Sequence, residues 1–155
     1  MAGSHKAGAK IATHRKAFRD YQVIDRLEAG VELRGTEVKS IREGQIDLAG
    51  GFARIEGGTA MLCGVTIAPY QYGHQFNHEP TRPRRLLLHR RQIDRLYGQT
   101  TKKGFTLIPL TCYFKGRRVK IEIGLCRGRQ DPDKREELRR QEAERDARRA
   151  IARHK

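Results

Sequence analysis

The chain has 155 residues, and its 33 lysine and arginine residues outnumber the 18 acidic residues to give a formal net charge of +15. This length suits one domain with extensions rather than two separate hydrophobic cores. So large a positive excess indicates a polyanionic partner. Nucleic acid is favoured over an anionic membrane, because no amphipathic helix combines a basic face with a broad apolar one. Charge alone does not distinguish a ribosomal protein, a DNA-binding module and an RNA chaperone.

The three cysteines stand singly in apolar stretches and form no CxxC pair, as is typical of buried thiols in a reducing compartment. The first residues lack the apolar centre of a secretory signal. No stretch approaches the roughly 18 apolar residues of a membrane helix. We therefore expect a cytoplasmic protein with no membrane partner.

The first half of the chain predicts strands joined by glycine-marked bends. Residues 1–13 are small, polar and basic, and we expect them to be disordered until they meet a partner. A long strand over 21–33 bends at Gly30. A short helix over 36–44 follows, with Thr36 as its cap and Gly44 at its end. Residues 52–55 and 60–67 form a hairpin around the two glycines at 57 and 58.

The second half begins with a long loop over residues 70–85, and loops of this length tend to be functional or mobile. A brief strand at 86–88 and a helix over 89–97 closed by Gly98 follow. Residues 105–114 and 117–126 form the last hairpin, in which alternate apolar residues bury one face. We predict a mainly β protein: a small closed antiparallel β-barrel of the oligonucleotide-binding type, with two or three short helices and a disordered C-terminal tail. Its parts are a disordered extension (1–13), the RNA-binding barrel (14–130) and the tail (131–155).

The C-terminal residues carry dense charge of both signs and almost no apolar side chains. Acid-first pairs such as Glu136/Arg140 and Glu144/Arg148 favour a helix. The apolar stripe is too thin to dock on a core, so we expect the tail to become helical only against a partner. The composition is equally compatible with a second interpretation, in which the C-terminus is frayed and has no function.

Motifs of catalysis are missing from the chain: it has no phosphate-binding loop, dinucleotide fingerprint, nucleophile elbow or zinc-protease motif. His74 and His78 lack a third metal ligand at suitable spacing, so we expect neither a metal nor a cofactor. One enzymatic alternative stays open, a metal-dependent nuclease that uses Glu28, Glu37 and Asp47.

Binding chemistry is more plentiful. Phosphates can be neutralised by eight basic residues: Arg15, Lys16, Lys39, Arg42, Arg82, Arg84, Arg85 and Lys120. Stacking faces can come from Tyr21, Tyr70, Tyr72 and Phe76, each of which can equally be a packing residue. Glu28 can only accept a hydrogen bond from RNA or orient an arginine. Leu87 either packs in the hydrophobic core or packs against an unstacked base of the RNA.

Several segments in this order resemble the SsrA-binding protein family, the bacterial partners of transfer-messenger RNA. They are HRKAFRDY (14–21), EAGVELRGTEVKSIREG (28–44), FARIEGG (52–58), FNHEPTRPRRLLLHRRQIDRLYG (76–98), GFTLIPLTCYFKGRRVKIEIGLCRG (104–128) and DKRE (133–136). The resemblance implies an oligonucleotide-binding barrel that grips the tRNA-like domain of transfer-messenger RNA. It further implies delivery with elongation factor Tu to the A site of a stalled ribosome. There the tail would fold as a helix in the empty mRNA channel, near the small-subunit decoding centre.

The resemblance and the residue chemistry together give two sets of expected site residues. The expected RNA-binding residues are His14, Arg15, Lys16, Tyr21, Glu28, Lys39, Arg42, Arg84, Arg85, Leu87 and Lys120. The expected ribosome-binding tail residues are Arg127, Arg129, Asp133, Lys134 and Arg135.

Two positions depart from the family pattern. The family usually has asparagine where this chain has His14, which keeps the hydrogen-bonding capacity and adds a titratable group. It usually has histidine or tyrosine where this chain has Pro132, which cannot stack on a base in the same way but favours the start of a helix. The alternative to a ribosome-rescue factor is a general oligonucleotide-binding protein.

Overall fold

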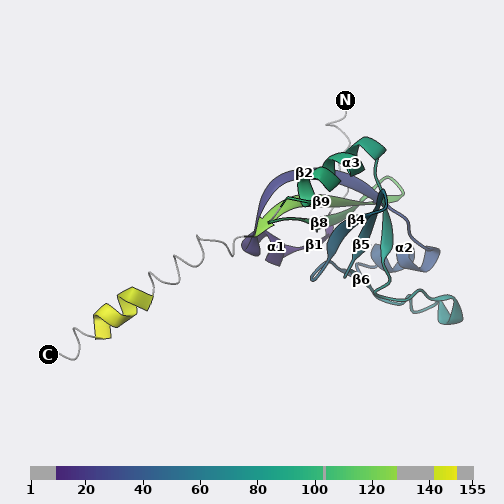
Figure 1. The fold of residues 1–155 in the computed structure, drawn as a ribbon. Coiled ribbons are helices and arrows are strands. Elements are labelled where there is room, and N and C mark those ends of the chain that lie inside the picture. Colours follow the sequence, from purple (N-terminus) through teal and green to yellow (C-terminus); the bar gives the residue numbers. More distant parts are fainter. Residues whose placement is uncertain (1–9, 103, 129–141, 150–155) are drawn as a thin grey trace.

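The computed structural model describes residues 10–102, 104–128 and 142–149 (Figure 1). The elements follow one another as β1 (Lys10–Thr13), α1 (Arg15–Asp20), β2 (Tyr21–Val31), α2 (Gly35–Arg42), β3 (Ile46–Asp47), β4 (Phe52–Glu56), β5 (Thr59–Cys63), β6 (Thr66–Ile67), the 3-10 turn η2 (His74–Phe76), β7 (Arg84–Leu87), α3 (Arg90–Thr100), β8 (Phe105–Lys115) and β9 (Arg118–Gly128). The prediction of a mainly β protein with a few short helices is confirmed.

Seven strands form one antiparallel sheet in the order β1-β8-β4-β5-β7-β2-β9. Strand β9 also pairs with β8, so the pairings lead from β8 through β4, β5, β7, β2 and β9 back to β8. The two-residue strands β3 and β6 form a separate small sheet. The longest pairings join β9 to its neighbours β2 and β8, and these pairings position the functional residues described below.

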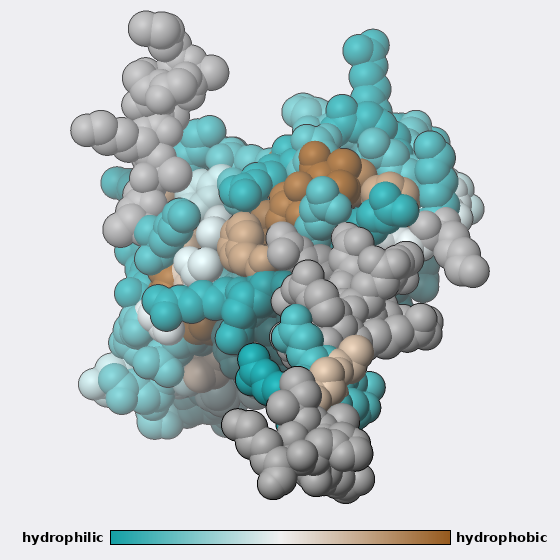
Figure 2. Space-filling model, turned by 90° about the vertical axis from the view of Figure 1, so that its left-hand side faces the viewer, coloured by the Kyte–Doolittle hydropathy of each residue, from teal (hydrophilic) through white to brown (hydrophobic). Residues whose placement is uncertain are grey.

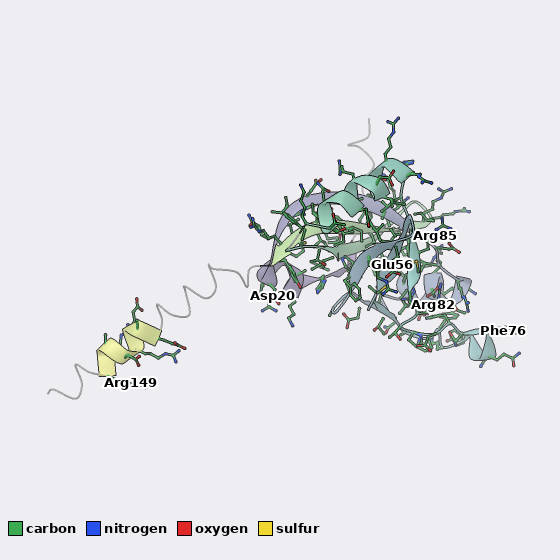
Figure 3. All side chains as sticks on the ribbon, in the orientation of Figure 1. Asp20, Glu56, Phe76, Arg82, Arg85 and Arg149 are labelled. Atoms are coloured by element: carbon green, nitrogen blue, oxygen red, sulfur yellow. The ribbon has the colours of Figure 1, made fainter. Side chains whose placement is uncertain are left out.

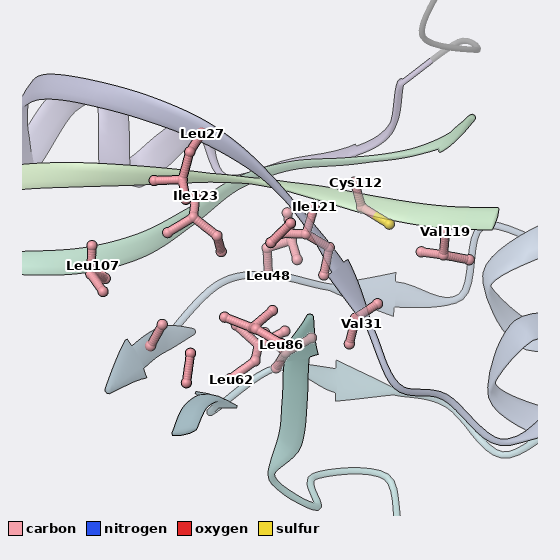
Figure 4. Close-up of a cluster of buried hydrophobic side chains, with 14 of the residues drawn as sticks. Leu27, Val31, Leu48, Leu62, Leu86, Leu107, Cys112, Val119, Ile121 and Ile123 are labelled. Atoms are coloured by element: carbon pink, nitrogen blue, oxygen red, sulfur yellow. The ribbon is translucent and has the colours of Figure 1, made fainter. Parts of the chain in front are cut away.

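The β8–β9 hairpin forms as its alternating pattern predicts. Its turn contains Gly116, whose φ of +63° lies in the left-handed region that glycine adopts without strain. The alternate residues Val119, Ile121, Ile123 and Leu125 are all buried. They pack against Leu27, Leu48, Leu62, Leu86 and other apolar side chains in the main core (Figure 4). All three cysteines are buried and free, as predicted.

The N-terminal expectation is wrong for residues 10–13. These residues form β1, which pairs with the outer edge of β8 from Thr13↔Thr111 to Lys10↔Tyr113. Their sequence has no strong strand pattern, and they are ordered because the long strand β8 offers free hydrogen-bonding groups. Helix α1 follows at once and was not predicted. Residues 1–9 lie outside the described residues.

Three helix and strand boundaries also differ from the predictions. Strand β2 runs through Gly30 without a break. The N-cap of α2 is Arg34 rather than Thr36, whose hydroxyl instead bonds His78. Helix α3 continues past Gly98 to Thr100. The predicted left-handed residue at Gly44, with a φ of +75°, is confirmed.

Part of the C-terminal tail is described. Residues 142–149 are helical, and all eight are exposed (Figure 1). This helix differs from the expectation that the tail is helical only against a partner. The other tail residues lie outside the described ranges, and folding on the ribosome stays a prediction. None of the helices in the described residues is long and apolar enough to cross a membrane.

Candidate nucleic-acid interface

A groove of about 430 Å³ lies where β2, β7 and β9 meet the start of α3. It brings together four of the predicted RNA-binding residues: Glu28, Arg85, Leu87 and Lys120. We call it the first groove. The start of α3 adds His89 and Gln92 to its lining, two residues that the sequence did not single out.

Gly30 is the floor of the first groove. It stands between Leu87 on β7 and Lys120 on β9 in the sheet register. A Cβ atom at Gly30 would lie 3.2 Å from Leu87 Cβ and 3.6 Å from Lys120 Nζ. The missing side chain therefore lets an apolar side chain and an ammonium group approach each other from two strands. Leu87 remains 52% exposed, so it is no core residue.

Glu28 lies two residues before Gly30 on the same face of β2. The hydroxyl of Tyr113 donates a hydrogen bond of 2.5 Å to Glu28 Oε2, and Lys115 Nζ donates one of 3.2 Å to Oε1. The bond from Tyr113, with the nearby charges of Lys115 and Lys120, lowers the pKa of Glu28 below its ordinary value despite partial burial. Glu28 is thus an ionised acceptor beside the leucine and the ammonium group.

A second groove of about 460 Å³ lies beside α1 and contains three other predicted residues, His14, Lys16 and Tyr21. Phe52, which is 42% exposed, also lines it. Tyr21 is half-buried against a small apolar cluster and pairs with Gly128, whereas Gly30 pairs with Lys120. Nine residues of extended strand separate the two positions, about 30 Å at 3.3 Å per residue. The predicted residues therefore form two groups rather than one.

His14 is a structural residue of the second groove. Its ring Nδ1 lies 3.1 Å from the carbonyl oxygen of Pro109, and its backbone N–H donates to Leu110 O at 2.8 Å. Both contacts fall where the β8–β9 register is irregular, between Pro109 and Thr111. His14 is only 7% exposed. These contacts fix the start of α1 on the bulged strand, and an asparagine amide can donate the same bond. An RNA-binding role of His14 stays a prediction.

The prediction that Arg84 binds RNA needs correction. Its side chain is 1% exposed and lies inside the protein. Its Nε donates to Glu37 Oε2, while its two terminal nitrogens donate to the carbonyl oxygens of Val65 and Pro80. Glu37 is fully buried and also accepts bonds from Arg82 and the Arg34 backbone. Every nitrogen of Arg84 is occupied, so none is available to a phosphate.

The remaining predicted basic residues are spread over the surface. Lys39 and Arg42 on α2 lie over the rings of Tyr70 and Phe114 at 5.5 and 5.6 Å. Arg127 lies 5.9 Å from the ring centre of Phe105, and Arg15 is exposed on α1. Four predicted tail residues lie outside the described residues: Arg129, Asp133, Lys134 and Arg135.

The geometry does not support the nuclease alternative. Glu37 is held by Arg82 and Arg84, whereas Glu28 is held by Tyr113 and Lys115. Within the described ranges, no three histidine, cysteine or acidic side chains gather as metal ligands. His78 binds the Thr36 hydroxyl and the Ile67 carbonyl instead.

The surface is predominantly hydrophilic on the face shown in Figure 2. Figure 3 places Asp20, which lines the second groove, and Arg85, which lines the first, toward opposite ends of the strands. The two grooves lie at the two ends of the β2–β9 pairing, the first with Arg85 and Lys120 and the second with Lys16, and they can contact a nucleic acid at separate points. Such an arrangement suits a folded RNA better than a single extended strand.

Sequence reasoning missed Tyr113 and the role of Gly30. The cross-strand register could have revealed both, because Tyr113 faces Lys120 on β9 and Lys120 faces Gly30 on β2. The sequence pattern placed Tyr113 in an apolar strand, so its hydroxyl was not considered as a hydrogen-bond donor.

Comparison with known proteins identifies the family of the chain. A family model described as SmpB protein matches residues 11–153. The chain is 52% identical over 141 residues to the SsrA-binding protein of Carboxydothermus hydrogenoformans, over 91% of this chain and 95% of that one. It is 55% identical over 158 residues to the SsrA-binding protein of Roseiflexus castenholzii, over 99% of this chain and 100% of that one.

A solved structure described as "tmRNA-SmpB: a journey to the center of the bacterial ribosome" is similar with a TM-score of 0.68 and 44% identity. The similarity covers 83% of this chain and 94% of that chain. Both grooves fall within the residues that the family model matches. The resemblance seen in the sequence is confirmed, and the chain belongs to the SmpB protein family.

Proposed function

We propose that this protein binds the tRNA-like domain of transfer-messenger RNA and delivers it, with elongation factor Tu, to the A site of a stalled ribosome. The observation that carries the proposal is the convergence of Leu87, Lys120 and Glu28 around Gly30. An apolar surface, a cation and an ionised acceptor are the three groups that an unstacked nucleotide requires for its base, its phosphate and its donors. Membership of the family supports the same conclusion, and so does the similar structure, whose description names tmRNA, SmpB and the bacterial ribosome.

The fold suits this task if its sheet closes as a small barrel of the oligonucleotide-binding type. The return of the pairings from β9 to β8 supports closure. In this proposal the protein acts in the cytoplasm, by binding and not by catalysis.

The C-terminal tail binds the ribosome rather than transfer-messenger RNA. In this proposal, residues 131–155 lie as a helix in the vacant mRNA channel, with Asp133, Lys134 and Arg135 near the decoding centre. The exposed helix at residues 142–149 supports an element that has no core of its own to dock on.

The binding step is tested with a fluorescently labelled tRNA-like fragment of transfer-messenger RNA and a single-stranded RNA of equal length. We expect the folded fragment to bind at least tenfold more tightly at 0.15 M salt, and Glu28→Gln to weaken that binding. Equal affinity for both RNAs would instead identify a general oligonucleotide-binding protein.

The delivery step is tested by removing residues 131–155. The truncated protein should bind the tRNA-like fragment with unchanged affinity. It should no longer support peptide tagging on ribosomes stalled without a stop codon. Loss of RNA binding on truncation would contradict the division of tasks between body and tail.

A further inference from the structure

Tyr113 lies at the edge of the first groove with its ring buried and its hydroxyl on Glu28. The residue is 7% exposed, and its hydroxyl donates the 2.5 Å bond to Glu28 Oε2 described above. It comes from β8, two strands away from β2, and reaches Glu28 diagonally across β9. Such a buried ring holds its hydroxyl in one place, because few rotamers are open to it.

We infer that Tyr113 is a positioning residue for RNA recognition: its hydroxyl holds the Glu28 carboxylate as a fixed acceptor for an N–H or O–H donor of the bound RNA. The inference rests on the proposed function and names a group that acts through Glu28 without touching the RNA.

The surroundings of the carboxylate support this role. Lys115 binds the other oxygen of Glu28 at 3.2 Å, so the two oxygens are held from two positions on β8. The side chains of Lys115 and Glu28 are 38% and 36% exposed, which leaves the carboxylate open to a ligand. Each carboxylate oxygen has a second lone pair, so an RNA donor can bind without displacing Tyr113.

The two pKa values also agree with this geometry. The bond to Tyr113 is the largest influence on the pKa of Glu28 and lowers it. Burial and the same bond raise the pKa of Tyr113, so its hydroxyl stays protonated and remains a donor. The pair therefore keeps one proton on the tyrosine and a negative charge on Glu28 over the physiological range.

The test uses Tyr113→Phe in the full chain, which removes one oxygen and keeps the ring. We expect affinity for the tRNA-like fragment to fall about five- to tenfold at pH 7, the size expected for losing a charge-assisted hydrogen bond that orients a ligand group. We also expect affinity to decline at a higher pH than in the wild type as the solution is acidified, because Glu28 loses the bond that keeps it ionised. Tyr97→Phe, which removes a hydroxyl from an exposed tyrosine on α3, is the matched control and should change neither value.

A double-mutant comparison separates positioning from direct contact. Tyr113→Phe should cost no further affinity in a protein that already carries Glu28→Ala, because alanine offers the hydroxyl no acceptor. An equal loss in both backgrounds would overturn the inference, because the tyrosine would then act independently of Glu28. So would an unchanged affinity and pH profile in Tyr113→Phe.

NMR titration of Glu28 in the free protein measures the coupling without RNA. A pKa of Glu28 that does not rise in Tyr113→Phe would overturn the inference even if RNA binding were lost. If the wild-type protein itself does not prefer the tRNA-like fragment, the proposed function fails. If it does and Glu28→Gln weakens binding while Tyr113→Phe does not, only the role of Tyr113 fails.

Discussion

Arg84 and Glu37 form an ion pair inside the protein: Arg84 Nε lies 2.5 Å from Glu37 Oε2, and the two side chains are 1% and 0% exposed. The pair ties α2 to β7, and the other nitrogens of Arg84 extend it to the backbone at Val65 and Pro80. A cation so placed contributes to the fold, whereas its neighbour Arg85 faces the first groove. Adjacent arginines therefore have separate tasks.

Arg84→Met should lower the free energy of unfolding by about 3 kcal/mol, because removing one partner leaves a buried carboxylate with incomplete compensation. Urea denaturation measures this loss. RNA affinity of the folded fraction should remain unchanged. Arg85→Met is the matched control and should have the opposite profile, with nearly unchanged stability and weaker RNA binding. A large loss of RNA affinity without a loss of stability in Arg84→Met would contradict the structural role.

The stability of the fold should depend on acidity through Glu37. Burial alone would raise the pKa of Glu37, but hydrogen bonds from Arg82, the Arg34 backbone and Arg84 outweigh burial and lower it below the ordinary value of 4.5. A carboxyl group whose pKa is lower in the folded state than in the unfolded state stabilises the folded state at pH values above its ordinary pKa. This stabilisation is lost as the pH falls through the folded-state pKa. The free energy of unfolding should thus be level near neutrality and decline below about pH 4.5.

Glu37→Gln is the variant that checks this origin. It should be less stable at pH 7, and its stability should decline less steeply between pH 4.5 and acid unfolding, as followed by circular dichroism. Glu28→Gln removes a more exposed carboxylate and should change the curve less. Identical slopes for Glu37→Gln and the wild type would show that another carboxylate governs acid unfolding.

Gly30→Ala should disturb the first groove more than the fold. The new Cβ would lie 3.2 Å from Leu87 Cβ and 3.5 Å from Leu87 Cδ1, which forces that side chain aside by a few tenths of an ångström. We expect RNA affinity to fall several-fold, as measured by fluorescence anisotropy, and a larger loss for Gly30→Val. Gly98→Ala on α3 is the control, because an added Cβ there meets nothing within 4 Å. It should keep RNA affinity and raise stability by about 0.5–1 kcal/mol.

Much of the fold was predictable because apolar strand segments are separated by glycine-marked turns, and because β9 alternates between buried and more exposed residues over positions 118–123. The error at Arg84 shows where such patterns fail. A strand places residues two apart on one face, so Arg84 shares the face of Leu86 and Arg85 shares the face of Leu87. Which face turns inward depends on pairing with β2 and β5, which the local sequence does not specify. Strand β1 was missed for a similar reason, since its order comes from its partner β8.

The candidate site was predictable in its parts but not in its assembly. Family resemblance indicated Glu28, Leu87 and Lys120, yet only the register brings them around Gly30. Gly30 appeared as a bend in the strand pattern, whereas its lack of a side chain allows Leu87 and Lys120 to meet. A glycine has this effect through its neighbours on adjacent strands, and these are distant in sequence.

Leu87 and Lys120 should contribute to RNA binding in different ways. Lys120→Met should weaken binding and reduce the slope of log affinity against log salt by about one, because one phosphate contact releases about one counterion. Leu87→Ala should weaken binding with the slope unchanged, since an apolar contact with a base releases no counterion. Affinities measured from 0.05 to 0.3 M salt give both slopes. A slope that stays constant in Lys120→Met would show that no phosphate lies against Lys120. A slope that falls in Leu87→Ala would show that Leu87 does more than contact a base.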